Sequence, residues 1–180
     1  MRTSNTEIRD LGLAWIALSV AFVILLFRNA LFSGDPGVVA VIFGMCALTA
    51  GVAFLLHELA HKVVAQHFGQ IAEFRADYQM PGLAVLSAMI GFLFAAPGAV
   101  YHRGNITPRE NGLIAIAGPV TNLVLAGGFF ALLLVAPGDG LLSTVASLGV
   151  WINAFLAAFN MIPFGPLDGK TVKDWNLGVF

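Results

Sequence analysis

Four long runs without a charged side chain constrain the fold of this sequence most strongly. They comprise residues 11–27, 36–56, 111–138 and 140–167. A helix needs about 20 predominantly apolar residues to cross the hydrocarbon core of a bilayer. Only 11% of the 180 residues are charged, whereas a typical soluble domain has about 25%. The sequence therefore predicts an all-α polytopic membrane protein whose four transmembrane helices lie in a lipid bilayer.

The segment between the second and third runs is expected to form something other than a fifth span. Small or apolar residues alternate with charged or amide residues over 72–80, which predicts a strand with one wet face, and residues 99–102 would pair with it. An irregular surface loop is the alternative for both. The apolar run 82–96 between them is 15 residues long, which suits a re-entrant or interfacial segment. We therefore expect a small membrane-associated β-sheet and a re-entrant or interfacial segment here.

The few charges exclude some functions and predict an orientation. Nine Lys and Arg residues against ten Asp and Glu give a net charge of −1, which argues against a basic face for nucleic acid. The single Cys46 allows no internal disulfide. If the N-terminus is cytoplasmic and residues 79–100 turn back, eight of the nine basic residues lie inside and only Arg28 outside. We expect a multi-pass protein of the cell membrane with its N-terminus in the cytoplasm, and with the end of the second run, which leads into His57 and His61, on the same side.

The second run leads directly into His57-Glu58-Leu59-Ala60-His61, the pattern H-E-x-x-H. Residues i and i+4 share one face of a helix, so the imidazoles of His57 and His61 can bind one Zn²⁺. Glu58 lies about 100° around the helix from His57, where its carboxylate can take a proton from water as a general base. Ionisable groups at this depth are costly and functional by default. The alternative is a polar helix end that carries two histidines by chance.

A catalytic zinc site needs a third protein ligand and leaves its fourth position to water. Asp168 is the best candidate, because an apolar run broken by two prolines ends there in an Asp-Gly turn. Unwound backbone at membrane depth is tolerated only where it lines a cavity. His67 and His102 are the alternatives, although each is more simply interpreted as a surface or interfacial histidine. Two crossings separate Asp168 from the H-E-x-x-H motif, which brings all three ligands to the same side.

With these residues in place, the chain resembles the site-2 protease family of intramembrane zinc metalloproteases, particularly its small prokaryotic members. The likeness covers roughly residues 44–174 and rests on three motifs in the family's order: His57–His61, Ala-Gly-Pro-Val-Thr-Asn at 117–122 and Asn-Met-Ile-Pro-Phe-Gly-Pro-Leu-Asp-Gly at 160–169. The resemblance implies His57, His61 and Asp168 as ligands of one zinc ion per chain, and Glu58 as the catalytic base. It also implies a three-helix catalytic core with a membrane-associated sheet between its first two helices.

The expected organisation has two parts, an N-terminal transmembrane helix with its outer loop (1–35) and a catalytic membrane core (36–180). The core comprises the H-E-x-x-H helix (36–68), the sheet and re-entrant region (69–110), the third span (111–138), the fourth span with the Asp-Gly motif (140–169) and the start of a possible further span (170–180). Members of the family usually carry more helices after this point. The resemblance therefore allows the chain to be the core of a six-helix protein.

The resulting hypothesis is an intramembrane zinc metalloprotease that hydrolyses a peptide bond in or near a transmembrane segment of a membrane-protein substrate. Asn122 and Asn160 carry amides in otherwise apolar helices, and they are expected to bind the unwound substrate or the oxyanion. Hydrogen bonding between helices is the alternative for both. Gly118, Gly127 and Gly128 are expected to allow close helix packing. The alternative function is a non-proteolytic membrane metal-binding protein or metal transporter with a closed four-ligand site.

Overall fold

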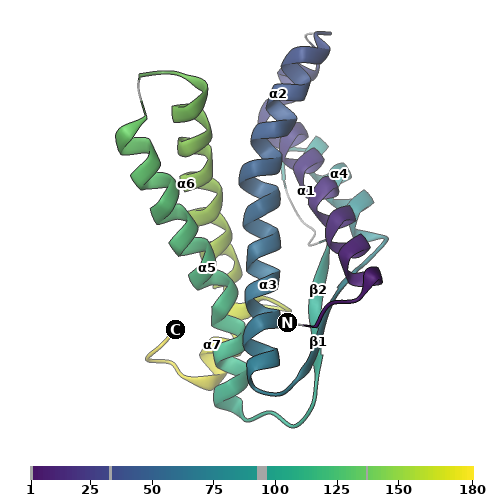
Figure 1. The fold of residues 1–180 in the computed structure, drawn as a ribbon, viewed down its shortest axis with the longest axis vertical. Coiled ribbons are helices and arrows are strands. Elements are labelled where there is room, and N and C mark those ends of the chain that lie inside the picture. Colours follow the sequence, from purple (N-terminus) through teal and green to yellow (C-terminus); the bar gives the residue numbers. More distant parts are fainter. Residues whose placement is uncertain (1, 33, 93–96, 137) are drawn as a thin grey trace. The chain divides into compact units, whose positions relative to one another are not determined.

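The computed structural model describes residues 2–32, 34–92, 97–136 and 138–180 (Figure 1). Its helices are α1 (Asn5–Leu31), α2 (Pro36–Cys46), α3 (Val52–His67), α4 (Met80–Met89), α5 (Pro108–Val135), α6 (Leu141–Asn160) and α7 (Asp168–Trp175), and the π-helical turn η1 (Ala47–Gly51) joins α2 to α3. Its strands are β1 (Ile71–Ala76) and β2 (Gly98–Arg103). Residues 93–96 of the expected re-entrant segment and Pro137 of the turn after the third run lie outside this description.

Four helices are long and apolar enough to cross a membrane, as the uncharged runs predict. They are α1, the continuous helix of 32 residues from Pro36 to His67, α5 and α6. Capping side chains set where the first three begin. Ser4 accepts a hydrogen bond from the Glu7 N–H at the start of α1, and Asp35 caps α2. Thr107 and Glu110 form a capping box at the start of α5.

Strands β1 and β2 pair as a two-stranded sheet, which confirms the predicted sheet. The pairing is antiparallel, because the Asp77 N–H after β1 donates to the Pro97 carbonyl just before β2. The strand expected over 72–80 is too long, however, since β1 ends at Ala76. The Asp77 side chain accepts a hydrogen bond from the Gln79 N–H at 3.0 Å, a local turn that competes with the ladder. Helix α4 then begins at Met80 with a proline in its first turn.

Helix α4 occupies the first half of the segment that is expected to be re-entrant or interfacial. Its 10 residues make a helix about 15 Å long, too short for a hydrocarbon core of about 30 Å. Within the described residues this segment therefore adds no fifth span. A re-entrant or interfacial position for residues 79–100 stays a prediction.

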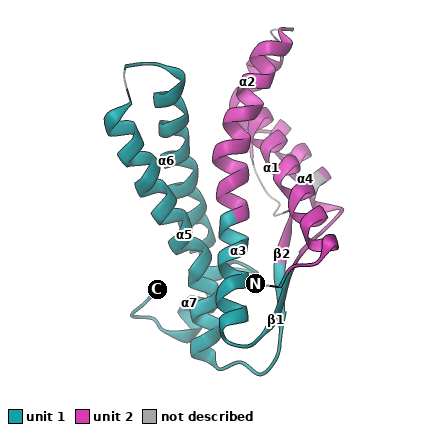
Figure 2. Cartoon of the chain, viewed as in Figure 1, with its two compact units in different colours: residues 1–2, 56–73, 100–180 teal, residues 3–55, 74–99 magenta. Residues whose placement is uncertain are grey.

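The chain divides into two compact units, which are described separately (Figure 2). The first comprises residues 1–2, 56–73 and 100–180. In it α5 packs along α6 and also against α7, and Gly112 of α5 lies so close to the Trp175 indole of α7 that a Cβ would collide with the ring. A small core of Ala65, Ala72 and Ile114 joins α3, β1 and α5. This unit contains every predicted site residue.

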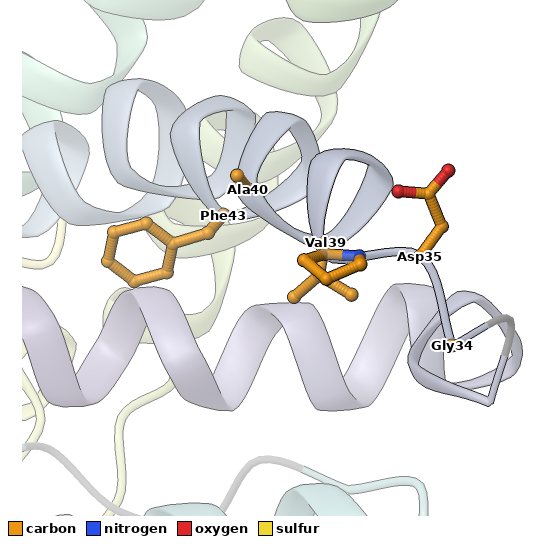
Figure 3. A pocket seen from close by; sticks show the side chains of 6 residues that line it. Gly34, Asp35, Val39, Ala40 and Phe43 are labelled. Carbon is orange, nitrogen blue, oxygen red and sulfur yellow. The ribbon is translucent and has the colours of Figure 1, made fainter.

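The second unit comprises residues 3–55 and 74–99. In it α1 packs against α4 through Ala21, Ala84 and Ala88. An apolar pocket lies at the start of α2, and its lining residues include Val39 and Phe43 (Figure 3). Asp35 also lines this pocket, but its carboxylate accepts hydrogen bonds from the first N–H groups of α2. The pocket therefore brings together no group of metal-binding or catalytic side chains.

Two buried carboxyl groups of α1 cover the outer edge of β1. Glu7 accepts a hydrogen bond from the Phe74 N–H at 3.0 Å, and Asp10 accepts one from the Ala76 N–H at 3.2 Å. Glu7 and Asp10 are 0% and 1% exposed. They are three residues apart and so lie on one face of the helix, whereas Phe74 and Ala76 are two apart and direct their N–H groups to one edge of the strand. This edge of the sheet is therefore closed to another strand.

Replacing Glu7 by leucine is expected to lower the free energy of unfolding by about 1–3 kcal/mol, since the buried Phe74 N–H loses its acceptor. Glu7→Gln keeps a side-chain oxygen at the same reach and is expected to retain most of the stability. Equilibrium unfolding in detergent measures both. Equal stability of the two variants would show that the hydrogen bond to the strand contributes nothing.

Candidate metal centre

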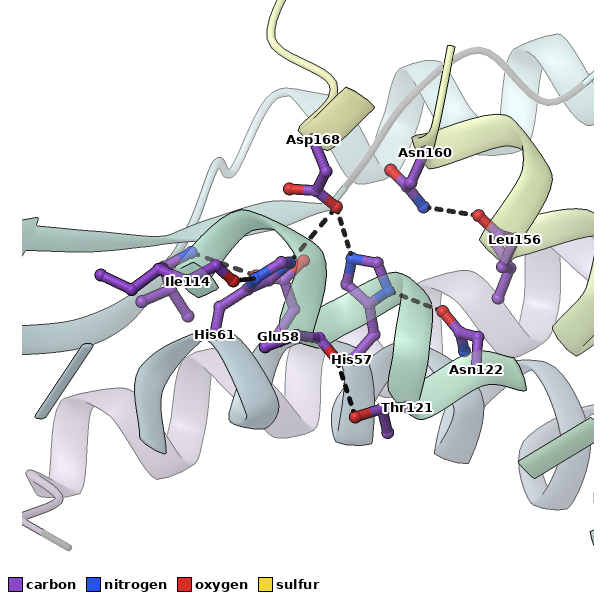
Figure 4. A network of polar contacts seen from close by, with 11 residues as sticks. His57, Glu58, His61, Ile114, Thr121, Asn122, Leu156, Asn160 and Asp168 are labelled. Atoms are coloured by element: carbon purple, nitrogen blue, oxygen red, sulfur yellow. Dashed lines mark hydrogen bonds and ion pairs between the residues drawn. The ribbon is translucent and has the colours of Figure 1, made fainter. Parts of the chain in front are cut away.

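The side chains of His57, His61 and Asp168 converge in the first unit (Figure 4). His57 and His61 lie one turn apart on α3, both buried, with ring centroids 4.6 Å apart. Asp168 Oδ2 lies 3.2 Å from His57 Nε2 and 3.4 Å from His61 Nε2. In a tetrahedral zinc site with bonds of about 2.0–2.1 Å, neighbouring ligand atoms are about 3.3–3.4 Å apart. The spacing of the three side chains therefore fits zinc.

The hydrogen bonding of the same atoms also fits a cation. The Ile114 carbonyl lies 2.7 Å from His61 Nδ1, and because a carbonyl only accepts, Nδ1 carries a proton and donates it. In the neutral imidazole Nε2 then presents a lone pair to Asp168. Asp168 Oδ2 is buried and has no hydrogen-bond donor in the structure. Acceptors that face each other at this distance need either a proton or a metal ion between them.

Asp168 reaches the histidines because α6 ends at Asn160 and the chain turns back. Residues 161–167 form irregular turns that include two prolines, and Asp168 is then the first residue of α7. The expected Asp-Gly turn is therefore wrong, since both residues belong to a helix. Gly169 is required at this point, because a Cβ would collide with the Met161 carbonyl. The close return of α7 onto the end of α6 thus places the carboxylate.

The pKa of Asp168 favours a ligand that is already ionised. Burial alone would raise this pKa, but the neighbouring imidazoles of His57 and His61 lower it below its usual value. The ionised form of Asp168, which is the form that binds a metal ion, is therefore favoured.

Zinc binding is expected to weaken as the pH falls, because a metal ion binds the neutral imidazole and has to displace any proton on the nitrogen that it binds. Titration calorimetry in buffers of different ionisation enthalpy counts the released protons, and metal affinity measured from about pH 5.5 to pH 8 gives the slope. An affinity that does not change with pH would argue against histidine ligands.

His67 and His102 do not join the three ligands. Within the described residues, only His57, His61 and Asp168 bring ligand atoms within 4.8 Å of one another. His67 is the last residue of α3, is exposed, and packs edge-on against Phe68. His102 is half-buried on β2, where burial lowers its pKa, as does the charge of His61. Three protein ligands leave a coordination position open, as a catalytic zinc site requires.

Glu58 is buried beside the two histidines and is held by the sheet. Its Oε2 accepts a hydrogen bond from the Val100 N–H of β2 at 3.1 Å. This contact fixes the carboxylate at the centre without neutralising it. A fixed carboxylate next to a metal site is arranged for proton transfer.

Gly118 lets α5 lie close against the two histidines of α3, as the sequence predicts, and it thereby forms part of the wall of the centre. A Cβ at this position would lie 2.5 Å from Nε2 of both His57 and His61. The absence of a side chain therefore leaves space at the two metal-binding nitrogens. Gly127 and Gly128 are expected to allow close packing, but a Cβ on either would meet no heavy atom within 4 Å, whereas Gly149 lies against the Phe129 ring.

Asn122 and Asn160 occupy different environments. Asn122 is fully buried, with its Oδ1 2.6 Å from His57 Nδ1 and its Nδ2 donating to Asn153 Oδ1 at 3.1 Å. Asn160 is half-buried at the end of α6 and donates to the Leu156 carbonyl. A substrate contact by either amide stays a prediction. Asn153 is a further buried amide that the sequence motifs do not single out, and its position in an uncharged run was the available signal.

Comparison with known proteins identifies relatives that are named for an enzymatic activity. The chain is 40% identical to "Putative zinc metalloprotease MJ0611" of Methanocaldococcus jannaschii, across 97% of this chain and 87% of that protein. It is 37% identical to "Putative zinc metalloprotease YwhC" of Bacillus subtilis, across 69% of this chain and 65% of that protein. It is 32% identical to "Putative zinc metalloprotease Rip3" of Mycobacterium tuberculosis, across 84% of this chain and 37% of that protein. No family model and no solved structure matches the chain.

The relatives and the geometry agree on the metal and on the type of chemistry. The relatives are named for zinc and proteolysis, and the structure contains a three-ligand centre whose spacing suits zinc. The chain therefore belongs to the family of zinc metalloproteases that these relatives represent, and zinc is its cofactor.

Proposed function

We propose that this protein is an intramembrane metalloprotease of the site-2 type, which hydrolyses peptide bonds in or near the transmembrane segments of membrane proteins. One observation carries the proposal: His57, His61 and Glu58 lie on a helix whose length and composition suit a membrane, and Asp168 follows the end of another such helix, α6. His57, Glu58 and His61 belong to the helix that starts at Pro36, and this helix has 32 residues and is predominantly apolar. A soluble metalloprotease has no need for such a helix.

The side chains around the centre have separate roles in metal binding and proton transfer. His57, His61 and Asp168 would hold zinc, which when bound supplies Lewis-acid activation of a water molecule and of the scissile carbonyl. Glu58 accepts the proton of the attacking water and returns it to the leaving amine. The Val100 N–H keeps the Glu58 carboxylate in place while it is ionised. Burial of these groups excludes bulk water, which strengthens each electrostatic contact.

The substrate must be unwound before it is cleaved, because a helix hides its carbonyls in its own hydrogen bonds. Strand addition to a sheet edge gives the freed backbone groups new partners. Glu7 and Asp10 accept hydrogen bonds from the outer edge of β1. On β2 the Val100 N–H donates to Glu58 in the same way, so a substrate strand there would have to pair with the other backbone groups of that edge. A substrate strand on β2 would therefore run beside the catalytic base.

The charges support an orientation with the centre on the cytoplasmic side of the cell membrane. The H-E-x-x-H motif lies at the end of the second span, and α5 and α6 return the chain to the same side at Asp168. With the N-terminus inside, eight of the nine basic residues lie in the cytoplasm. The chain would then cleave its substrates near the inner leaflet.

Reconstitution into lipid vesicles with a single-span substrate tests the proposal. The wild-type protein is expected to cleave the substrate in the presence of zinc, with cut sites inside or at the edge of the apolar segment as measured by mass spectrometry. Asp168→Asn is expected to lose zinc and activity. Asp174→Asn, an exposed change on the same helix, is the matched control.

Three outcomes would contradict the proposal. Cleavage confined to water-soluble segments would indicate an ordinary metalloprotease, and zinc transfer across the vesicle membrane without cleavage would indicate a transporter. Full activity of Asp168→Asn would remove Asp168 from the ligand set.

A further inference from the structure

A chain of three hydrogen bonds, which we call the relay, runs from α6 through α5 to His57. The Gly149 carbonyl at its α6 end determines which atom donates in each bond. Asn153 Nδ2 lies 2.9 Å from the Gly149 carbonyl, Asn122 Nδ2 lies 3.1 Å from Asn153 Oδ1, and His57 Nδ1 lies 2.6 Å from Asn122 Oδ1. Asn122 and Asn153 are both 0% exposed. All of these groups belong to the same compact unit.

The Gly149 carbonyl sets the orientation of both amides. A carbonyl oxygen can only accept, so the Asn153 end that faces it must be the NH₂ group. The Asn153 oxygen then faces Asn122 and requires an NH₂ donor from it, which turns the Asn122 oxygen towards His57. An amide oxygen also only accepts. His57 Nδ1 must therefore carry the proton, and in the neutral ring Nε2 must present its lone pair.

We infer that Asn122 and Asn153 are positioning residues that hold His57 in the tautomer with Nε2 free to bind the metal. The inference rests on the proposed metal centre and deepens it, because it assigns a role to two amides outside the ligand set. His61 has a simpler device, since the Ile114 backbone carbonyl holds its Nδ1 proton directly. The tautomer of His57 therefore depends on side chains, which a substitution can remove, whereas that of His61 depends on the backbone.

The relay makes a prediction that simple helix packing does not make. Asn122→Asp keeps an oxygen that accepts from His57 but loses the NH₂ that bonds Asn153. If Asn122 acts only as a hydrogen bond between helices, this variant loses its function as completely as Asn122→Leu. If Asn122 orients His57, the carboxylate replaces the amide oxygen, as in the carboxylate–histidine–zinc arrangements of other metal sites.

The test uses the full chain in detergent with Zn²⁺ and Co²⁺ as probes. Asn122→Leu and Asn153→Leu are expected to weaken zinc binding by roughly 10–100-fold, the usual effect of losing an outer partner of a ligand. Asn122→Asp is expected to keep the affinity within about threefold of the wild type, because the acceptor for His57 is retained. Thr121→Val is the matched control, because Thr121 precedes Asn122 on α5 and its hydroxyl donates to the Ala117 carbonyl of its own helix (Figure 4).

Two spectroscopic readouts report on the imidazole itself. Nitrogen NMR of His57 in the metal-free protein, recorded where the ring is neutral, is expected to show the Nδ1–H tautomer in the wild type and a mixture in Asn153→Leu. In Asn122→Asp the visible spectrum of the Co²⁺ form is expected to remain that of a tetrahedrally coordinated ion. A variant that was merely less stable would shift thermal unfolding without changing the tautomer.

The results separate the relay from the proposed function. Wild-type affinity in Asn153→Leu, or an affinity in Asn122→Asp as weak as in Asn122→Leu, would overturn the relay alone. Failure of the leucine variants to fold would leave Asn122→Asp to decide between the two interpretations. A wild-type chain that binds neither metal would overturn the metal centre and the relay with it.

Discussion

Glu58→Gln is expected to abolish peptide hydrolysis while zinc stays bound with wild-type affinity. The amide cannot accept the proton of the attacking water, and general-base catalysis contributes roughly 10²–10⁴-fold to such a rate. We therefore expect the turnover number to fall by about a thousandfold or more. The ligand set is untouched, because His57, His61 and Asp168 make the centre without Glu58. Cleavage of a reconstituted substrate and metal analysis of the same sample measure the two effects together.

Glu110→Gln is the control for the same chemical change on another helix. Glu110 accepts the Thr107 N–H in the capping box of α5, and glutamine serves equally at this position of the box. This variant should cleave at the wild-type rate. Residual wild-type activity in Glu58→Gln would remove Glu58 from the role of base, and loss of zinc in it would mean that Glu58 helps to hold the metal.

Gly118→Ala is expected to remove zinc binding, although alanine has a higher helix propensity than glycine. Alanine is about 1 kcal/mol better than glycine inside a helix, and α5 keeps its backbone hydrogen bonds. The new methyl group, however, would lie 2.5 Å from Nε2 of both His57 and His61, in the space that the two nitrogens need for a metal. Since even the loss of an outer partner of a ligand costs about 10–100-fold in affinity, we expect zinc binding to weaken by at least about a hundredfold and cleavage to disappear.

Gly127→Ala is the matched control on the same helix, since a Cβ there meets no atom within 4 Å. It should bind zinc and cleave as the wild type does. Metal content per chain and thermal unfolding distinguish the two effects. If Gly118→Ala kept stoichiometric zinc, the imidazoles would have to move apart easily, and the tight wall at Gly118 would have no role in binding.

Much of the fold and the ligand set could be predicted because the signals are local. An uncharged run of sufficient length predicts a span without knowledge of its neighbours, and all four runs became apolar helices. His57 and His61 needed only the four-residue spacing of a helix. The alternation before Met80 predicted β1, although its end at Ala76 depended on the local turn at Asp77.

The remaining features depend on contacts between residues far apart in the chain. Asn122 and His57 are 65 residues apart, and Ile114 and His61 are 53 apart. The role of Gly118 depends on what lies opposite it, and the same residue type at Gly127 faces open space. In the sequence Glu7 is an ordinary charge at a helix start, yet its carboxylate helps to close a strand edge 67 residues away.

The sequence by itself determined the chemistry that the chain carries: two imidazoles and a carboxylate base within one helical turn, and an aspartate after a broken span. Only the tertiary structure decided how those groups are held, because the positions of the Gly118 backbone, the Asn122–Asn153 amides and the Val100 N–H result from packing between α3, α5, α6 and β2. Local spacing can be inferred from a run of residues, since it follows from helix geometry alone. The tautomer of a ligand and the space for a metal depend on distances between residues that are far apart in the chain. Those distances are defined only once the segments have packed.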